Sequence, residues 1–232
     1  MLGCAWAGAA LFVAALGYFL YAYLVRFGAP GGPGPVIGPI LINVTLFSGF
    51  ALHHSLFART RLKQVVKRSL PPVLERSAYA WVASVLLVAT CWWWQPVPGT
   101  LYVLSGWAAW AGMVAQVAGI VLTFAGSRAI DVLDLAGVRP VLLARSGRAA
   151  PHVPLVTTGV YRIVRHPLYF GWALLVFGAP HMTATRAVFA VVSTLYLAIA
   201  IIWEERALVD TFGGAYHAYC QRVRWRMLPG LY

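Results

Sequence analysis

Six long runs of apolar residues constrain this chain more than any other feature of its sequence. Most of them approach the about 20 residues that a helix needs to cross a membrane. Only 10% of the 232 residues are charged, whereas soluble domains average about 25%. The pattern predicts an all-α polytopic membrane protein, a bundle of five to six transmembrane helices. The predicted spans are residues 3–25, 36–58, 77–94, 106–126, 168–180 and 185–203.

The fifth predicted helix, residues 168–180, is short. It gives roughly 20 Å of helix against a hydrocarbon core of about 30 Å. The segment therefore either spans the bilayer or only dips into it, and the sequence leaves both options open. Together with residues 185–203 it forms a predicted hairpin whose turn lies near Ala179, Pro180 and His181.

The positive charges of the chain fall mainly on one side of the predicted spans. Only Arg26 and Arg186 lie in connections on the other side. By the positive-inside rule both termini are expected in the cytoplasm. The net charge of +12 is therefore explained by topology, and the absence of a basic stripe with interleaved aromatics disfavours nucleic-acid binding. The cytoplasmic cations are Arg59, Arg61, Lys63, Lys67, Arg68, Arg76, Arg128, Arg139, Arg145, Arg148, Arg162, Arg165, Arg206, Arg222, Arg224 and Arg226.

The three cysteines, Cys4, Cys91 and Cys220, are far apart in the sequence. No Cys-x-x-Cys pair occurs among them, so neither a disulfide framework nor a thiolate metal site is indicated.

The first polar cluster of interest is Arg165-His166-Pro167, just before the fifth apolar run. Pro167 lacks an N–H and disfavours helix in the residue before it, so a helix is expected to start near Pro167. Arg165 and His166 would then precede a helix N-terminus, where a carboxylate binds well. An arginine at a helix end can also be a plain topology anchor. Because Tyr161 and Tyr169 are near in the sequence, a binding site is favoured over a plain anchor.

The second polar cluster is Glu204-Glu205 at the end of the last predicted span. The chain has only six acidic residues, so two adjacent carboxylates are notable, although they could simply be solvated or paired at the surface. Such carboxylates accept hydrogen bonds from ammonium groups or ribose hydroxyls. Together with Arg165 and His166 they fit a zwitterionic amino-acid head.

Apolar residues recur at helical spacing after Glu205. They are Leu208, Phe212, Ala215 and Tyr219. The spacing predicts a cytoplasmic C-terminal amphipathic helix along the membrane, weakened in its middle by Gly213 and Gly214.

A motif in the last 75 or so residues resembles the isoprenylcysteine carboxyl methyltransferase superfamily, membrane enzymes that use S-adenosylmethionine. It comprises Gly159, Tyr161, Arg165, His166, Pro167, Tyr169, Gly171, Glu204, Glu205, Phe212, Gly213, Tyr216, Tyr219, Arg222 and Val223. The resemblance implies that the motif residues Arg165, His166, Pro167, Tyr169 and Glu204 hold the methionine head of the cofactor. It likewise implies that Gly159, Tyr161 and Glu205 shape the pocket around the ribose and adenine, with Arg222 on the acceptor side.

A narrower resemblance covers nearly the whole chain. The segments LHHSLFAR (52–59), PPVLERSAY (71–79) and DLAGVR (134–139) resemble a family of bacterial methanethiol S-methyltransferases. The chain departs from this family near Asp131 and Val132, where an Asn-His pair is expected. The likeness implies a single methyltransferase domain over residues 1–232, in a bacterial inner membrane. Its parts would be a four-helix membrane part (1–126) and a cofactor-binding loop, hairpin and C-terminal helix (127–232).

The implied reaction converts methanethiol, a small lipophilic thiol, to dimethyl sulfide and leaves S-adenosylhomocysteine. The nucleophile is the thiolate, which a cationic environment favours, so Arg165 and Arg222 are candidate catalytic residues. His54 is a candidate proton acceptor, although a histidine within a span can simply be satisfied by a neighbouring group.

Other functions stay open at this point. The acceptor could be another lipophilic molecule, such as a prenylcysteine carboxylate, an isoprenoid or a phospholipid amine. A non-catalytic membrane subunit that assists redox-enzyme assembly would bind no cofactor. A transporter is disfavoured because no inverted repeats are evident, and the oligomeric state is left open.

Overall fold

The computed structural model describes residues 1–57, 70–129, 131–148 and 154–232. The chain divides into two compact units, Met1–Pro98 with Ile130–His152, and Gly99–Ala129 with Val153–Tyr232. The expectation of a single methyltransferase domain stays a prediction. Some predicted features lie outside the described residues. They are the end of the second predicted span at Ala58 and the side chain of Arg128. The predicted cytoplasmic cations outside them are Arg59, Arg61, Lys63, Lys67 and Arg68.

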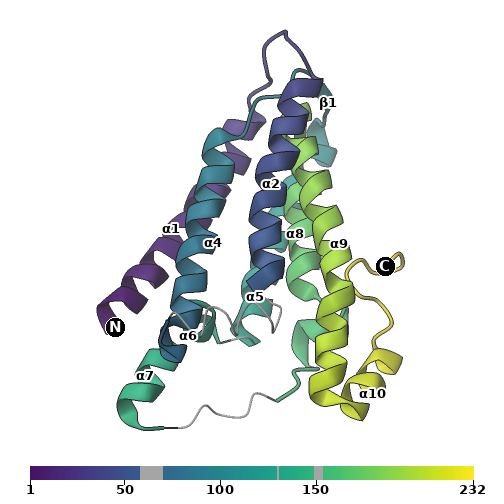
Figure 1. Ribbon diagram of the computed structural model, residues 1–232. Helices are drawn as coiled ribbons and strands as arrows, with labels where there is room; N and C mark the ends of the chain where they lie inside the picture. The colour runs from purple at the N-terminus through teal and green to yellow at the C-terminus, as the bar shows by residue number, and fades with distance from the viewer. Residues whose placement is uncertain (58–69, 130, 149–153) are drawn as a thin grey trace. The chain divides into compact units, whose positions relative to one another are not determined.

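Among the described residues, five helices are long and apolar enough to cross a membrane. They are α1 (Leu2–Leu24), α2 (Ile37–Phe57), α4 (Glu75–Trp93), α5 (Gly106–Ala129) and α9 (Ala184–Phe212) (Figure 1). A sixth apolar helix, α8 (Pro167–Phe177), is shorter. The predicted all-α polytopic membrane bundle with a short fifth helix is confirmed, and the chain is an integral membrane protein.

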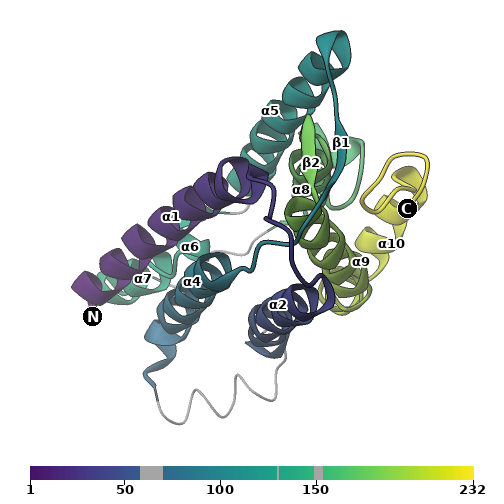
Figure 2. The same ribbon diagram turned by 90° about the horizontal axis from the view of Figure 1, so that it is seen from above.

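In the first unit, α1 packs along α4, and Figure 2 shows them side by side. The contact is close because a Cβ on Gly8 would lie 2.7 Å from Nε1 of Trp81. That nitrogen donates to the Cys4 carbonyl at 3.1 Å. The buried Asn43 on α2 exchanges hydrogen bonds with the Gln95 backbone at 2.8 and 2.7 Å, which fixes α2 to the segment after α4.

The same unit contains η2 (Pro72–Leu74), α6 (Val132–Leu135) and α7 (Arg139–Ser146). Gly137 joins the last two with φ +75, and a Cβ there would lie 2.4 Å from the Ser77 nitrogen. Only glycine suits both the dihedral and the contact. Ser77 donates to the Gly137 carbonyl at 2.7 Å, and Arg76 pairs with Asp134 at 2.7 Å. Two of the sequence segments that carry the narrower resemblance are therefore neighbours in the fold.

In the second unit, α5 and α8 approach backbone to backbone. A Cβ on Gly119 would lie 2.5 Å from the Gly171 carbonyl oxygen, and one on Gly171 would lie 2.4 Å from Oγ1 of Thr123. The glycines of α5 in this contact, Gly112, Gly119 and Gly126, recur every seven residues. Small residues at such spacing let membrane helices pack closely.

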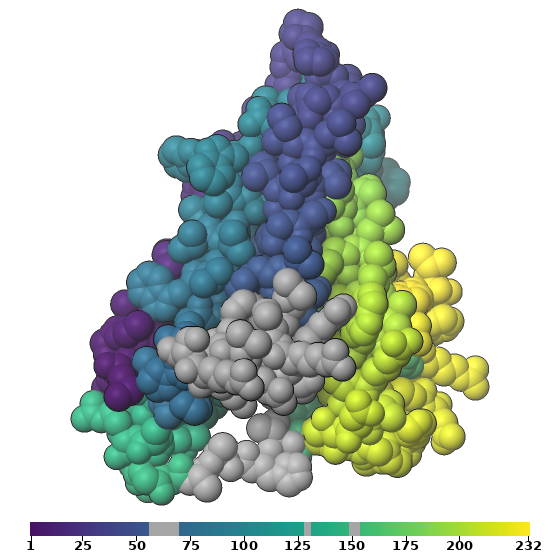
Figure 3. All heavy atoms as spheres, viewed as in Figure 1, coloured from purple at the N-terminus to yellow at the C-terminus, as the bar shows by residue number. Residues whose placement is uncertain are grey.

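A short antiparallel pair of strands, β1 (Thr100–Val103) and β2 (His181–Thr183), lies at one end of this unit. The strand β2 occupies part of the turn expected near residues 179–181. Thr183 then caps α9, because its hydroxyl accepts from the Arg186 N–H at 3.1 Å. Figure 3 shows the side chains of α9 exposed along one face, in keeping with its exposed apolar residues Val191, Leu195 and Ile199.

The C-terminal part differs from the prediction in one respect. Helix α9 does not end at Glu204-Glu205 but continues to Phe212, and Glu205 forms ion pairs with Arg165 and Arg226. Gly213, with φ 52 and ψ −125, separates α9 from α10 (Gly214–Arg222). The predicted amphipathic helix is thus divided: Leu208 and Phe212 belong to α9, and Ala215 and Tyr219 to α10.

Candidate functional site

The site begins at the first residue of α8. Pro167 is at that position and His166 caps the helix, as the sequence predicts. The backbone N–H groups of Arg165 and His166 donate to the carbonyls of Trp225 and Arg226 at 2.9 and 2.8 Å. The Arg-His pair is therefore held against the C-terminal segment through its main chain, which leaves both side chains free to point toward α9.

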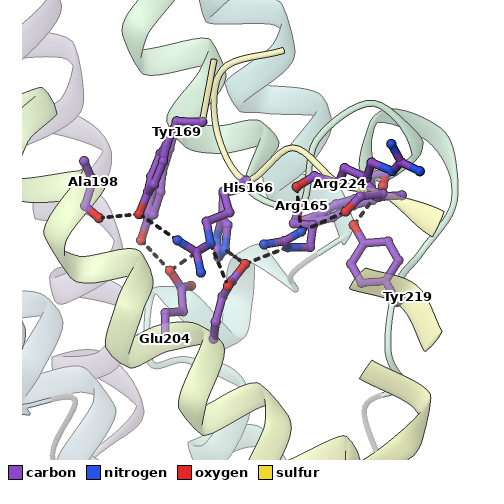
Figure 4. A network of polar contacts seen from close by, with 12 residues as sticks. Arg165, His166, Tyr169, Ala198, Glu204, Tyr219 and Arg224 are labelled. Carbon is purple, nitrogen blue, oxygen red and sulfur yellow. Dashed lines mark hydrogen bonds and ion pairs between the residues drawn. The ribbon is translucent and has the colours of Figure 1, made fainter. Parts of the chain in front are cut away.

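Glu205 is the centre of a charge cluster, and Figure 4 shows its neighbours Arg165, His166 and Glu204 close together. Arg165 Nε donates to its Oε1 at 2.6 Å, and Arg226 Nε donates to its Oε2 at 3.0 Å. His166 Nε2 lies 3.4 Å from Oε1. The side chains of Arg165 and Glu205 are only 8% and 12% exposed. Since Arg165 Nη1 also donates to the carbonyls of Val223 and Arg224 at 2.8 and 2.9 Å, this arginine ties α8, α9 and the C-terminal segment together.

Glu204 forms the more open side of the same site. Its Oε2 accepts from the Tyr169 hydroxyl at 2.9 Å and lies 3.4 Å from His166 Nδ1. The rings of His166 and Tyr169 stack, with centroids 5.4 Å apart and planes 9° apart. The Glu204 side chain is 46% exposed, so a ligand can reach this carboxylate while its neighbours are held in place.

The electrostatics of the cluster favour a protonated imidazole at His166. Burial by itself lowers the pKa of His166, but hydrogen bonds to Glu204 and Glu205, and the charges of both, raise it above its usual value. Burial also lowers the pKa of the Arg165 guanidinium, but its hydrogen bond to Glu205 and the charge of Glu205 raise that pKa above its usual value. The site thus places three basic side chains, Arg165, His166 and Arg226, and two carboxylates within one network.

The stabilising effect of His166 is expected to depend on pH. Because its folded-state pKa is raised from 6.5, the protonated form contributes fully below that value, and the contribution is lost as the pH rises through the raised pKa. The apparent melting temperature in detergent should therefore exceed that of His166→Gln by less at about pH 9 than at about pH 6. His217→Gln, at an exposed position on α10, is the matched control. A gap that does not change with pH contradicts the expectation.

Tyr161 and Gly159 join the site through η3 (Gly159–Arg162), which Gly159 begins with φ +61. The Tyr161 hydroxyl donates to the Gly126 carbonyl at 3.3 Å. The Tyr219 hydroxyl donates to the Tyr161 carbonyl at 2.7 Å. Burial raises the pKa of Tyr161, and the nearby charge of Glu204 raises it further, so the phenol stays protonated and can act as a donor.

The other two predicted catalytic residues, Arg222 and His54, lie on α10 and α2. Arg222 is exposed at the last residue of α10, and its side chain forms no hydrogen bond or ion pair with the other described residues. His54 belongs to the first unit, on α2, where its Nδ1 lies 2.5 Å from the Tyr79 hydroxyl. His53 stacks on the same Tyr79 ring, with centroids 5.4 Å apart.

Sequence reasoning missed Arg226 and Tyr232. Arg226 was assigned to topology alone, but its Nη1 donates to the Tyr232 hydroxyl at 3.2 Å, and its guanidinium lies 5.3 Å from the centroid of that ring. The Tyr232 hydroxyl donates in turn to the Ala198 carbonyl of α9 at 3.1 Å. The available signal was the rarity of acidic residues: a buried Glu205 needs compensating cations, and the arginines after α10 are near in sequence.

Comparisons with known proteins agree with the earlier resemblance. A family model described as phospholipid methyltransferase matches residues 107–215. Methanethiol S-methyltransferase 2 of Bradyrhizobium diazoefficiens is 35% identical over 88% of this chain and 82% of its own length. Proteins named methanethiol S-methyltransferase from Crocosphaera subtropica and Mycobacterium tuberculosis are 33% and 32% identical over 81% and 87% of this chain, and over 74% and 89% of their own lengths. No solved structure matches. With this identity over most of its length, the chain belongs to the methanethiol S-methyltransferase family.

Proposed function

We propose that this chain transfers the methyl group of S-adenosylmethionine to methanethiol, giving dimethyl sulfide and S-adenosylhomocysteine. The observation that carries the proposal is the cluster at the start of α8, where the open carboxylate of Glu204 lies beside His166 and Tyr169. We further propose that the enzyme lies in a bacterial inner membrane with both termini in the cytoplasm, which reporter fusions to each terminus would test.

The cluster suits the zwitterionic head of the cofactor. The cofactor's ammonium group would meet Glu204, whose carboxylate is partly exposed. The cofactor's carboxylate would meet His166 and the Nη2 of Arg165, whose N–H groups donate no hydrogen bond to the described residues. Glu205 holds Arg165 in position for this task. Pro167 begins the helix whose free N–H groups favour an anion.

The remaining motif residues are proposed to surround the nucleoside. The bend at Gly159 carries the chain into η3, and Tyr161 is fixed there by its contact with Gly126. Tyr169 stacks on His166 and donates to Glu204, so it would hold both side chains in place beside the nucleoside. The cofactor supplies a methyl group bonded to a positively charged sulfur, ready for in-line displacement.

The thiol sulfur gains the methyl group, the bond from that carbon to the sulfonium sulfur breaks, and the thiol proton leaves. We propose that His54 accepts this proton, with the Tyr79 hydroxyl fixing its ring. The guanidinium groups of Arg165 and Arg222 are proposed to favour the thiolate over the thiol. Positioning of the thiol sulfur in line with the methyl group supplies the rest of the rate enhancement.

Calorimetry with purified protein in detergent is expected to show S-adenosylmethionine binding that Glu204→Ala and Arg165→Ala weaken by about 10- to 100-fold. The estimate follows from losing one charged hydrogen bond, about 1.5–3 kcal/mol. Asp210→Ala is the matched control, because Asp210 is an exposed acidic residue on the same helix. His54→Gln and Arg222→Gln should retain binding but lower kcat.

The results separate the candidate functions. Failure of well-folded wild type to bind the cofactor would favour the non-catalytic assembly subunit. Retained binding with unchanged kcat in His54→Gln would remove His54 as the proton acceptor and leave the cofactor site intact.

An apolar cavity of about 310 Å³ lies beside the cluster. Two of its lining residues, Ala173 and Leu228, pack with Tyr169 and Tyr232 of the network. Its lining favours an uncharged thiol over a polar acceptor, and we propose that methanethiol enters through it. The cavity is lined by Ala115, Phe170, Ala173, Leu174, Phe177, Gly178 and Leu228.

A larger side chain in the cavity lining is expected to lower kcat/KM more for longer thiols than for short ones. Ala115→Leu should lower kcat/KM more for butanethiol than for methanethiol, with cofactor binding unchanged, because a larger side chain in the lining excludes the longer acceptor first. Ala118→Leu, on the exposed side of α5, is the control. Equal losses in both variants would argue against this route, and turnover of a prenylcysteine or a phospholipid amine instead of thiols would establish the alternative acceptor.

A further inference from the structure

The first unit carries a charged cavity that the proposed reaction does not use. It has a volume of about 470 Å³ and is lined by Tyr18, Tyr21, Arg26 and Trp92. Arg26 begins the short helix η1 (Arg26–Gly28) directly after α1, and Trp92 is near the end of α4. The cavity thus lies where these two helices end together.

The guanidinium of Arg26 is held entirely by neutral groups. Its Nη1 donates to the Tyr18 hydroxyl at 2.5 Å and to the Cys91 carbonyl at 3.3 Å. Its Nη2 donates to the Trp92 carbonyl at 3.4 Å, and its carbon lies 6.0 Å from the centroid of the Trp92 ring. These contacts fix the direction of the positive charge without neutralising it.

No carboxylate of this unit is placed to neutralise Arg26. The acidic residues of the first unit are Glu75, Asp131 and Asp134. Glu75 is the first residue of α4, so about 25 Å of helix separates it from Trp92. Asp131 and Asp134 form ion pairs with Arg139 and Arg76. Within the part of the chain that the structure describes, Arg26 forms no ion pair, and its charge suits an anionic ligand.

The surroundings of the cavity are those of a membrane interface. Tyr21 and Trp92 are 52% and 63% exposed, and such rings favour the headgroup level of a bilayer. Exposed Val13 and Leu16 lie farther along α1 from the cavity, three positions apart on the helix surface. An anion bound at Arg26 would therefore have an apolar helix face beside it, along which acyl chains can lie.

We propose that this cavity binds the phosphodiester of an anionic phospholipid. Arg26 supplies a planar donor suited to phosphate oxygens. The Tyr18 hydroxyl accepts from Arg26 and so keeps its own O–H to donate to the same phosphate. Free inorganic phosphate offers the same chemistry, but it would leave the aromatic rim and the apolar face of α1 unused. The site is separate from methyl transfer and does not rest on it.

Native mass spectrometry of the detergent-purified chain with dioleoylphosphatidylglycerol tests the proposal. Wild type is expected to retain one lipid, and Arg26→Gln should weaken its binding about tenfold or more, the effect of losing about 1.4 kcal/mol. Tyr18→Phe should weaken lipid binding a few-fold. Because it removes only a hydroxyl, it serves as the test variant if Arg26→Gln does not fold. Arg145→Gln, which removes an exposed cation of α7 in the same unit, is the control for net charge.

Three further results would overturn the proposal. Equal weakening by Arg145→Gln would mean general charge attraction. Equal retention of dioleoylglycerol, which lacks the phosphate, would mean that acyl packing alone binds. Binding of inorganic phosphate as tight as that of the lipid would assign the cavity to a soluble anion. S-adenosylmethionine binding should be unchanged in Arg26→Gln, so failure of this proposal and failure of the proposed enzyme function are distinguishable.

Discussion

Replacing Glu205 by alanine is expected to destabilise the protein by about 3–5 kcal/mol and to abolish S-adenosylmethionine binding. The carboxylate is 12% exposed and pairs with Arg165 and Arg226, while His166 lies 3.4 Å away. Its removal leaves the buried guanidinium of Arg165 without a counter-charge, which costs more than the attraction between the ions contributes. Arg165 then no longer holds the N-terminus of α8 against α9. The apparent melting temperature in detergent and calorimetric titration with the cofactor measure the two effects.

Two further variants make this result interpretable. Glu205→Gln keeps the shape and one acceptor oxygen, so it should retain part of the stability while losing the charge. Asp210→Ala removes an exposed acidic residue five positions later on α9 and should change neither property. If Glu205→Ala melts like Asp210→Ala, the cluster does not support the fold in the way that its geometry indicates.

Replacing Gly119 by leucine is expected to prevent stable packing of α5 against α8. A Cβ at this position would lie 2.5 Å from the Gly171 carbonyl oxygen and 2.6 Å from the Leu175 nitrogen. Both neighbours are backbone atoms, so relief requires the helices to separate. A cost of about 3 kcal/mol or more is expected, seen as loss of monodisperse protein in size-exclusion chromatography.

Gly17→Leu is the matched control for this substitution. Gly17 is an exposed glycine within α1, and nothing lies within 4 Å of a Cβ built there. The same change in propensity and size should therefore be tolerated. Normal yield and melting of Gly119→Leu would show that α5 and α8 are not in close contact in the membrane.

Much of the helical architecture was predictable because it depends on local sequence. Long apolar runs can satisfy their backbone groups in a membrane only as helices or closed barrels. Proline favours the first position of a helix, so Pro167 predicts the start of α8 from local sequence alone. The pairing of α5 with α8 was not predicted. The spacing of Gly112, Gly119 and Gly126 indicates a packing face, but it does not name the partner helix.

Some residues of the candidate site were likewise predictable from local sequence, and others were not. Arg165, His166, Tyr169 and Glu204 were predicted because each lies next to a helix end or an unusual carboxylate pair. Their role in holding the cofactor stays a prediction. Arg226 and Tyr232 were missed because they follow α10 in a segment without helical or alternating periodicity, from which no side-chain direction can be inferred.

The sequence by itself determined that this is a helical membrane protein with a polar motif at the start of a short helix, since apolar length, charge placement and proline act within a few residues. Only the tertiary structure decided that Glu205 is the buried centre of that motif and that α9 continues past it. The physical reason is that a carboxylate is buried at low cost only where cations lie beside it. Those cations, Arg165 and Arg226, come from segments 40 and 21 positions away.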